Sequence, residues 1–153
     1  MKHFHGAPKE ERALNAFVKL MRAAETVQGR LMSALDCMDL TASQFAVLEA
    51  LYHVGPLCLS DLAHKILKTS GNLTMVVGNL QKRGLVTRTR SASDKRYYQI
   101  TITDKGRKLM AQVFPKHLGR LVAMMSALSP SQQETLAALA KKLGTSAANT
   151  RTT

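Results

Sequence analysis

Hydrophobic residues recur at helical spacing along most of this chain, and the pattern is clearest in Ser70–Gly84, SGNLTMVVGNLQKRG. Spacing of i, i+3, i+4 and i+7 places side chains on one face of a helix. Four apolar residues of the stretch have this spacing: Leu73, Val76, Val77 and Leu80. The stretch is therefore predicted to be an amphipathic helix with this face toward a core.

The opposite face of this predicted helix is slim and nearly uncharged. Its central residues are Gly71, Met75, Gly78 and Lys82, and the residues beside them are Asn72, Thr74 and Asn79. A solvated face usually holds Glu and Lys, and each glycine costs a helix about 1 kcal/mol relative to alanine. A helix in the major groove of DNA needs a narrow face with amide and hydroxyl groups for base edges. We interpret the stretch as a DNA recognition helix, with a surface helix of unusual composition as the alternative.

Helices are also predicted before this stretch. The first runs from about Glu10 to Met38 and follows a flexible arm, residues 1–9. At 1.5 Å per residue it would be about 40 Å long, which exceeds what a small domain needs, so part of its apolar side is expected to contact another chain. Thr41 and Gln44 form a capping box that begins the second helix, residues 41–53.

A very short turn joins the next helix to the recognition helix. After an extended piece, Leu57–Leu59, Ser60 is predicted to cap a helix from Asp61 to Leu67. The chain then enters the recognition helix through residues 68–70. Two helices joined in this way are typical of a helix-turn-helix.

A β-hairpin is predicted directly after the recognition helix. Gly84 ends that helix as a C′ glycine, Val86–Arg90 is a strand, and the alternating residues 97–102 form its partner. The polar loop between the strands covers residues 91–96. Four basic residues crowd the hairpin beside a single acid, Asp94: they are Arg88, Arg90, Lys95 and Arg96. A hairpin in this position is the wing of a winged helix-turn-helix.

Two further helices are predicted near the end of the chain. Thr103 caps one over residues 104–126, which Pro115 should kink. The other begins at a capping box that contains a proline, covers residues 129–144 and ends at a glycine. Residues 145–153 are predicted to be disordered.

The charge of the chain favours a polyanionic partner. Its 153 residues include 22 Lys and Arg against 10 Asp and Glu, for a formal net charge of +12. This balance suits nucleic acid or an anionic membrane surface. No apolar run approaches the ~20 residues of a membrane span, and the first twelve residues hold no apolar segment of a signal peptide. No membrane partner and a cytoplasmic location are therefore expected.

Motifs of catalysis and metal binding are missing from the sequence. The two cysteines, Cys37 and Cys58, form no disulfide framework, and no group of Cys and His has the spacing of a zinc site. Phosphate-binding glycine motifs and the HExxH motif are absent. The sequence thus predicts no enzyme activity, no cofactor and no metal site.

Several motifs, in their order and spacing, resemble the MarR family of bacterial transcription regulators. They are Leu40-Thr41-x-x-Gln44-Phe45, Leu59-x-x-Leu62-Ala63, Leu80-x-x-x-Gly84-Leu85-Val86-x-Arg88, Asp94-x-Arg96 and Ile102-Thr103-x-x-Gly106. The resemblance implies a mainly α fold with a small β-hairpin wing. It places a winged helix-turn-helix at residues 40–103, between dimerisation helices at residues 10–38 and 104–144. It also implies a homodimer that binds a pseudo-palindromic operator.

The resemblance also implies roles for residues of the wing and the recognition helix. In the family, the arginine of the wing's D-x-R motif enters the minor groove and the acid holds it, which implies these roles for Arg96 and Asp94. The helix contacts correspond to Ser70, Asn72, Thr74, Asn79 and Lys82. Base contacts are expected from Asn72, Thr74 and Asn79, and phosphate contacts from Lys65, Lys68, Lys82, Arg90 and Lys95.

Many relatives are repressors that a small aromatic compound releases from DNA, so the expected function is a repressor released by such a ligand or another chemical signal. A weakly specific architectural DNA-binding protein is one alternative, because phosphate contacts carry no sequence information. A thiol-based redox or electrophile sensor that uses Cys37 or Cys58 is another. However, the region where the family's peroxide sensors carry their reactive cysteine, Glu10–Thr26, has none.

Overall fold

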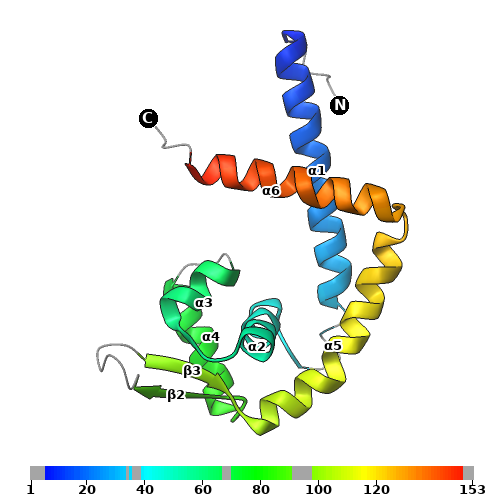
Figure 1. Cartoon of the computed structure of the whole chain (residues 1–153). Coiled ribbons are helices and arrows are strands. Elements are labelled where there is room, and N and C mark those ends of the chain that lie inside the picture. Colours follow the sequence, from blue (N-terminus) through cyan, green and yellow to red (C-terminus); the bar gives the residue numbers. More distant parts are fainter. Residues whose placement is uncertain (1–5, 34, 36–38, 67–69, 91–97, 150–153) are drawn as a thin grey trace. The chain divides into compact units, whose positions relative to one another are not determined.

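The structure, a computed structural model, describes residues 6–33, 35, 39–66, 70–90 and 98–149 (Figure 1). Its helices are α1 (Pro8–Ser33), α2 (Ala42–Val54), α3 (Leu59–Ile66), α4 (Ser70–Lys82), α5 (Asp104–Met125) and α6 (Pro130–Asn149), and its strands are β1 (Leu57–Cys58), β2 (Val86–Arg90) and β3 (Tyr98–Ile102). The chain divides into two compact units, Met1–His117 and Leu118–Thr153. The predicted fold class, mainly helical with a small hairpin, is confirmed.

The three strands form one antiparallel sheet in the order β1-β3-β2. β2 pairs with β3 from Val86, opposite Ile102, to Arg90, opposite Tyr98. β1, which the sequence indicates only as an extended piece, pairs with the other edge of β3. The hairpin strands of the wing are therefore present, while the loop between them, residues 91–97, lies outside the described residues.

The core of the first unit lies between this sheet and helices α2, α3 and α4. The predicted inner face of α4 is buried, since none of its four apolar residues is more than 8% exposed: Leu73, Val76, Val77 and Leu80. Fully buried partners come from α2, α3 and β3: Leu48, Leu51, Leu62 and Ile100. Burying each such side chain contributes about 1.5–3 kcal/mol, so this face holds α4 against the core and leaves its other face outward.

Both predicted capping boxes are confirmed. At the start of α2, the Gln44 N–H donates to Thr41 Oγ1 over 3.2 Å, and the Thr41 N–H donates to Gln44 Oε1 over 3.1 Å. At the start of α6, Ser129 and Gln132 exchange the same pair of bonds over 3.3 and 2.9 Å. Each box satisfies N–H groups that a helix start otherwise leaves without a partner.

α1 is shorter than predicted and begins earlier, at Pro8 instead of Glu10. Ala7 caps it, because its carbonyl accepts from the N–H of Glu10 over 2.8 Å and its own N–H donates to Glu10 Oε2 over 3.0 Å. Proline suits the first helical position, where its missing N–H is not needed. The helix ends at Ser33, whose hydroxyl donates to the carbonyl of Arg30 over 3.1 Å. Residues 36–38 of the prediction lie outside the described residues.

Two other predicted helix ends are wrong. α3 begins at Leu59, before the predicted start at Asp61, and its cap is Cys58 instead of Ser60, because Cys58 Sγ accepts the N–H of the third helical residue, Asp61, over 3.4 Å. α6 continues through Gly144 to Asn149. A glycine stops a helix by adopting positive φ, and among the described glycines only Gly55 and Gly84 do so. Residues 145–149, predicted to be disordered, are therefore helical.

α5 is one continuous helix through Pro115. Its middle contacts α2, where the ring of Phe45 lies 4.4 Å from that of His117 and the ring of His53 lies 4.6 Å from that of Phe114. Proline removes the N–H that would bond to the carbonyl four residues earlier, and its ring crowds that carbonyl. The kink expected at Pro115 stays a prediction.

Candidate nucleic-acid interface

The outward side of α4 carries small and polar groups. Asn72, Thr74, Asn79 and Lys82 are exposed, and Met75 in the centre of this side is 63% exposed. Gly78 lies beside Met75, and a Cβ atom added to it would meet only open space. This side of the helix can therefore approach another surface closely, with amides and a hydroxyl at its flanks.

The C-terminal end of α4 is closed by a Schellman motif. Gly84 adopts φ of +70°, its N–H donates to the carbonyl of Gln81 over 2.9 Å, and the N–H of Leu85 donates to the carbonyl of Leu80 over 3.0 Å. This geometry is the one expected of a C′ glycine. Gly84 thus ends α4 as the sequence predicts and turns the chain into β2.

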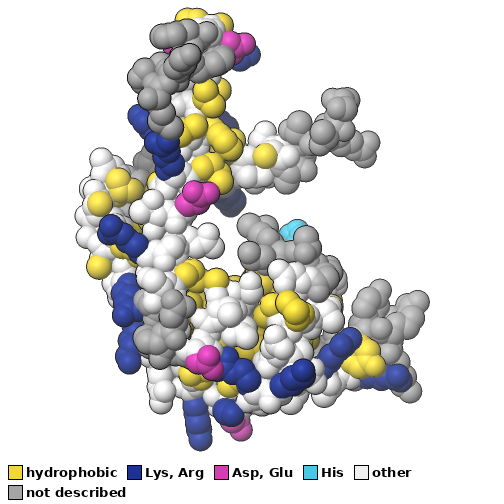
Figure 2. All heavy atoms as spheres, turned by 180° about the vertical axis from the view of Figure 1, so that it is seen from behind, with side chains coloured by type: hydrophobic (Ala, Val, Ile, Leu, Met, Phe, Trp, Pro, Cys, Tyr) yellow, Lys and Arg dark blue, Asp and Glu magenta, His cyan; other side chains and the backbone are white. Residues whose placement is uncertain are grey.

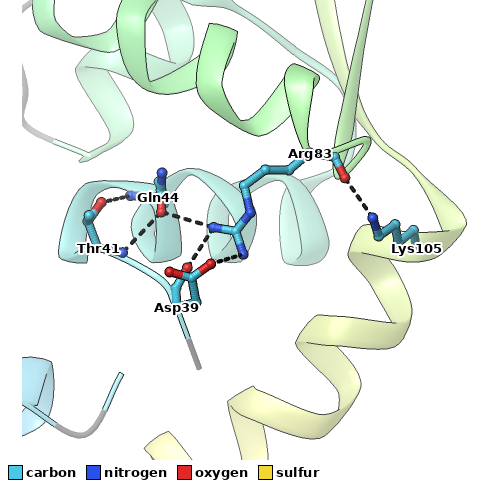
Figure 3. Close-up of polar contacts among 5 residues, drawn as sticks. All are labelled: Asp39, Thr41, Gln44, Arg83 and Lys105. Atoms are coloured by element: carbon cyan, nitrogen blue, oxygen red, sulfur yellow. Dashed lines mark hydrogen bonds and ion pairs between the residues drawn. The ribbon is translucent and has the colours of Figure 1, made fainter. Parts of the chain in front are cut away.

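Arg83, the last residue before this glycine, ties α4 to the start of α2 (Figure 3). Its Nη1 donates to the backbone carbonyl of Asp39 over 2.6 Å and to Gln44 Oε1 over 3.4 Å. Its Nη2 lies 3.4 Å from Asp39 Oδ2. Gln44 Oε1 also accepts the N–H of Thr41, so the guanidinium joins the capping box of α2. These contacts set the position of α4 relative to α2.

A second group of contacts ties α4 to the start of α5. Lys105 Nζ donates to the carbonyl of Arg83 over 2.8 Å, as Figure 3 shows, and Thr103 Oγ1 donates to the carbonyl of Gly84 over 2.8 Å. The N–H of Gly106 donates to Thr103 Oγ1 over 3.1 Å. A cation beside the carboxyl end of a helix also interacts favourably with the helix dipole. The candidate recognition helix is therefore held firmly at this end.

The hairpin carries an exposed cluster of one aromatic and two basic side chains. The guanidinium carbon of Arg88 lies 4.1 Å from the ring centroid of Tyr98, and that of Arg90 lies 6.0 Å from it. A hydrogen bond with Arg90 and the positive charge of that residue, together with the charge of Arg88, lower the pKa of the Tyr98 hydroxyl. Cation–π contact attracts the guanidinium groups to the ring, so two positive charges lie where the strands of the hairpin adjoin the wing loop.

The structure places the predicted contact residues in three regions. Asn79 and Lys82 line an open hollow of about 510 Å³ together with Arg83, Gln44 and residues 39–41. Lys65 is exposed at the end of α3 but lines a different hollow, of about 330 Å³, beside Glu49 and His53. Arg90 belongs to the hairpin cluster. The side chain of Ser70 and the four residues Lys68, Asp94, Lys95 and Arg96 lie outside what the structure describes.

Further basic residues extend this surface beyond those predicted. Figure 2 shows Lys and Arg side chains in a row along the lower edge of the view, over the hairpin and the start of α5. The exposed basic residues of α4, β2 and the first turns of α5 are Lys82, Arg88, Arg90, Lys105, Arg107 and Lys108. The last three lie within residues 104–144, which the sequence predicts as dimerisation helices, so they are not among the predicted DNA contacts. The density of cations just after the wing was the available signal.

The part of the chain that the structure describes offers little else chemically. No group of three or more His, Cys, Asp or Glu side chains there could hold a metal ion. None of the described helices is both long and apolar enough to cross a membrane. Cys58 Sγ lies 2.9 Å from Ser60 Oγ and serves as the cap of α3, while Cys37 lies outside the described residues.

Comparison with known proteins gives matches over most of the chain. The model of the MarR family matches residues 40–98. The HTH-type transcriptional regulator MhqR of Bacillus subtilis (strain 168) is 34% identical over 137 residues, which are 90% of this chain and 94% of MhqR.

Two solved structures have the same fold. One is Sco3205, a MarR family transcriptional regulator from Streptomyces coelicolor, in complex with DNA; it is 23% identical with a TM-score of 0.80, and the match covers 94% of this chain and 91% of Sco3205. The other is NadR in complex with 4-hydroxyphenylacetate; it is 23% identical with a TM-score of 0.74, and the match covers 94% of this chain and 96% of NadR.

Proposed function

This chain belongs to the MarR family of HTH-type transcriptional regulators and is a DNA-binding protein, and on this premise we propose that it is a cytoplasmic repressor. It binds a pseudo-palindromic operator as a homodimer and leaves it when a small aromatic ligand binds. The observation that carries the proposal is the outward side of α4, where exposed amides and a hydroxyl stand beside glycines instead of the usual charges. Such groups match base edges in the major groove.

In this proposal, the contacts to DNA divide into two kinds. Asn72, Thr74 and Asn79 bind base edges, and Ser70 lies at the start of the same helix. Phosphates are bound by cations of three elements: Lys65, Lys82 and Arg90. The wing loop adds Arg96 in the minor groove, held by Asp94, and Lys95 at the backbone, while Lys68 contacts phosphate from the turn before α4. These last four assignments rest on the sequence pattern alone.

Uncovered apolar faces support the homodimer. On α1, four apolar residues are between 36% and 59% exposed: Leu14, Phe17, Leu20 and Met21. On α6, three are between 40% and 61% exposed, at spacing i, i+3 and i+7: Leu136, Leu139 and Leu143. Contiguous apolar faces of this kind are typical of protein–protein interfaces. A second copy of the chain would bury them and would align two recognition helices with a two-fold symmetric operator.

A hollow in the first unit supports the small aromatic ligand. Its volume of about 330 Å³ lies within the range of small-molecule sites. Its apolar walls come from Ala46, Ala50, Val54 and Ile66, and Lys65, beside Glu49 and His53, offers a positive charge to an acidic ligand. NadR, which has the same fold, was solved with the aromatic acid 4-hydroxyphenylacetate. A ligand between α2 and α3 would disturb the helix that leads into α4.

The test is binding of the full-length protein to duplex DNA from its own promoter region, against a scrambled competitor, at about physiological salt. A protected palindrome and a specificity ratio above roughly 10³ would support the repressor. Equal affinity for both duplexes would instead favour architectural binding, which the net charge of +12 also supports. The complex is then treated with 4-hydroxyphenylacetate and with benzoate, and release by either supports the aromatic signal.

Two variants separate base contacts from phosphate contacts. Asn79→Ala should relax the preference at one base pair, because it removes an amide from the base-facing side. Lys82→Ala should weaken every duplex about equally and reduce the slope of affinity against salt by about one. If both variants weaken operator and scrambled DNA to the same degree, the assignment of Asn79 to a base is wrong.

The thiol-based sensor remains the alternative signal. Cys58 caps the first turn of α3 through its sulfur, so oxidation there would remove an acceptor from the helix start. Peroxide or quinone that releases DNA from the native protein but not from Cys58→Ser would favour this mechanism over the aromatic ligand. Release that persists in both Cys58→Ser and Cys37→Ser would exclude it.

A further inference from the structure

Met75 is an apolar side chain in the middle of an otherwise polar and small surface. It is 63% exposed, the highest value among the exposed large hydrophobic residues of the described chain. It lies on the central line of the outward side of α4, at the position where solvated helices carry Glu or Lys. Its contacts within the chain therefore do not explain it, whereas Leu73, Val76 and Val77 of the same helix are buried in the core.

Glycines lie next to Met75 along the centre of this face. Gly71 precedes it by four residues and Gly78 follows it by three, so both lie next to it on the helix surface. A Cβ atom at Gly78 would meet only open space, so no neighbour in the described part of the chain requires glycine there. With no side chain on either side, the helix backbone can approach a partner closely while Met75 projects into it. Asn72 and Asn79 flank the methionine on one side, with their amides exposed.

The major groove offers one strongly apolar group to such a side chain, the C5-methyl group of thymine. Methionine is unbranched and polarisable, so it adapts well to a small apolar target. We infer that Met75 contacts the C5-methyl group of one thymine in each half-site and makes the protein prefer thymine at that position. The inference rests on the proposed function, because it requires α4 to lie in the major groove. It adds an apolar specificity-determining residue to the amides and the single lysine of α4.

The test removes single methyl groups from the DNA. The full-length protein first selects its operator from a pool of random duplexes, and each thymine of that operator is then replaced by deoxyuridine, which lacks only the C5-methyl group. In each half-site, one particular thymine should be sensitive for the native protein. Replacing that single thymine should lower affinity roughly fourfold, the effect of exposing about one buried methyl-sized group. Replacement of the other thymines should have little effect.

Variants of Met75 show whether the methionine and the methyl group act on one another. Met75→Ala and Met75→Gln should lower affinity for the thymine operator and should be insensitive to deoxyuridine at the same position. Met75→Leu, the matched apolar control, should keep most of the sensitivity. All three residues are good helix formers on an exposed face, so the variants should keep the melting temperature of the native protein.

The outcomes separate this inference from the proposed function. If an operator is selected but Met75→Ala remains as sensitive to deoxyuridine as the native protein, Met75 does not contact the methyl group. If no deoxyuridine replacement weakens the native protein, the inference is equally wrong, while the repressor proposal stands. If no sequence is selected at all, both fail together.

Discussion

The Nη1 atom of Arg83 donates a hydrogen bond of 2.6 Å to the backbone carbonyl of Asp39, a residue 44 positions earlier in the chain. The Asp39 carboxylate is 96% exposed, and its Oδ2 lies 3.4 Å from Nη2. An exposed ion pair contributes little, whereas a hydrogen bond to a fixed backbone carbonyl sets geometry. The arginine thus links the end of α4 to the residues just before α2 mainly through that carbonyl.

Arg83→Ala and Asp39→Asn should therefore differ in their effect on stability. Arg83→Ala removes the bonds to the Asp39 carbonyl and to Gln44, and should lower the free energy of unfolding by about 1–2 kcal/mol. Asp39→Asn keeps the backbone carbonyl and should stay within about 0.5 kcal/mol of the native protein. Urea denaturation measures both. Equal destabilisation by the two variants would show that the charge pair, and not the carbonyl, is the important contact.

Two glycines within helices should respond oppositely to alanine. A Cβ atom at Gly106 would collide with the backbone oxygen of Leu85 and lie 2.7 Å from Ile102 Cγ1, so Gly106→Ala should destabilise the protein by about 2–4 kcal/mol. At Gly78 there is open space, so Gly78→Ala should stabilise it by about 0.5–1 kcal/mol. Thermal unfolding of the two variants side by side is the measurement. A stable Gly106→Ala protein would mean that α5 can move away from Leu85.

The stabilising variant should be the poorer DNA-binding protein. If α4 lies in the major groove, the methyl group of Gly78→Ala separates the helix from the bases and should lower operator affinity roughly fivefold to tenfold, about the effect of one base contact. Fluorescence anisotropy with the selected operator measures this change. Unchanged affinity, together with higher stability, would place the outward side of α4 away from the DNA.

The apolar face of α6 should be required for self-association. Leu139, which is 61% exposed, should tolerate glutamate in the single chain, but Leu139→Glu would bring a charge into the proposed interface at high cost. Sedimentation should show a dimer for the native protein and a monomer for this variant. Val54→Glu is the matched control, since Val54 is 47% exposed at the end of α2 and should leave the dimer intact. A dimer that survives Leu139→Glu would contradict the proposed interface.

The hairpin cluster should be visible in an alkaline titration. The hydrogen bond with Arg90 and the charges of Arg90 and Arg88 lower the pKa of Tyr98, so one of the three tyrosines should ionise below the usual value of about 10. Because the folded-state pKa is the lower one, any stabilisation exists at alkaline pH and is lost as the pH falls through that pKa. Stability at neutral pH should therefore not depend on this ionisation. Ultraviolet absorbance of phenolate measures the titration, and Arg90→Ala should return Tyr98 to the ordinary range.

The sequence by itself determined the features that depend on neighbouring residues. Helical spacing predicted the buried face of α4, and cap residues predicted the starts of α2 and α6, because these interactions join residues three or four positions apart. Gly84 was predicted as a helix stop for the same reason, and its positive φ confirms it. Local prediction was wrong where another atom competed, as at Cys58, whose sulfur replaces Ser60 in capping α3.

Only the tertiary structure decided the contacts between distant parts of the chain. The bond from Arg83 to Asp39, the approach of Gly106 to Leu85 and the pairing of β1 with β3 each join residues many positions apart. No periodicity encodes such contacts, because they depend on how whole elements pack around one core. The exposure of Met75 is of the same kind: the sequence placed it on the outward face of a helix, but only the packed fold showed that 63% of it stays exposed.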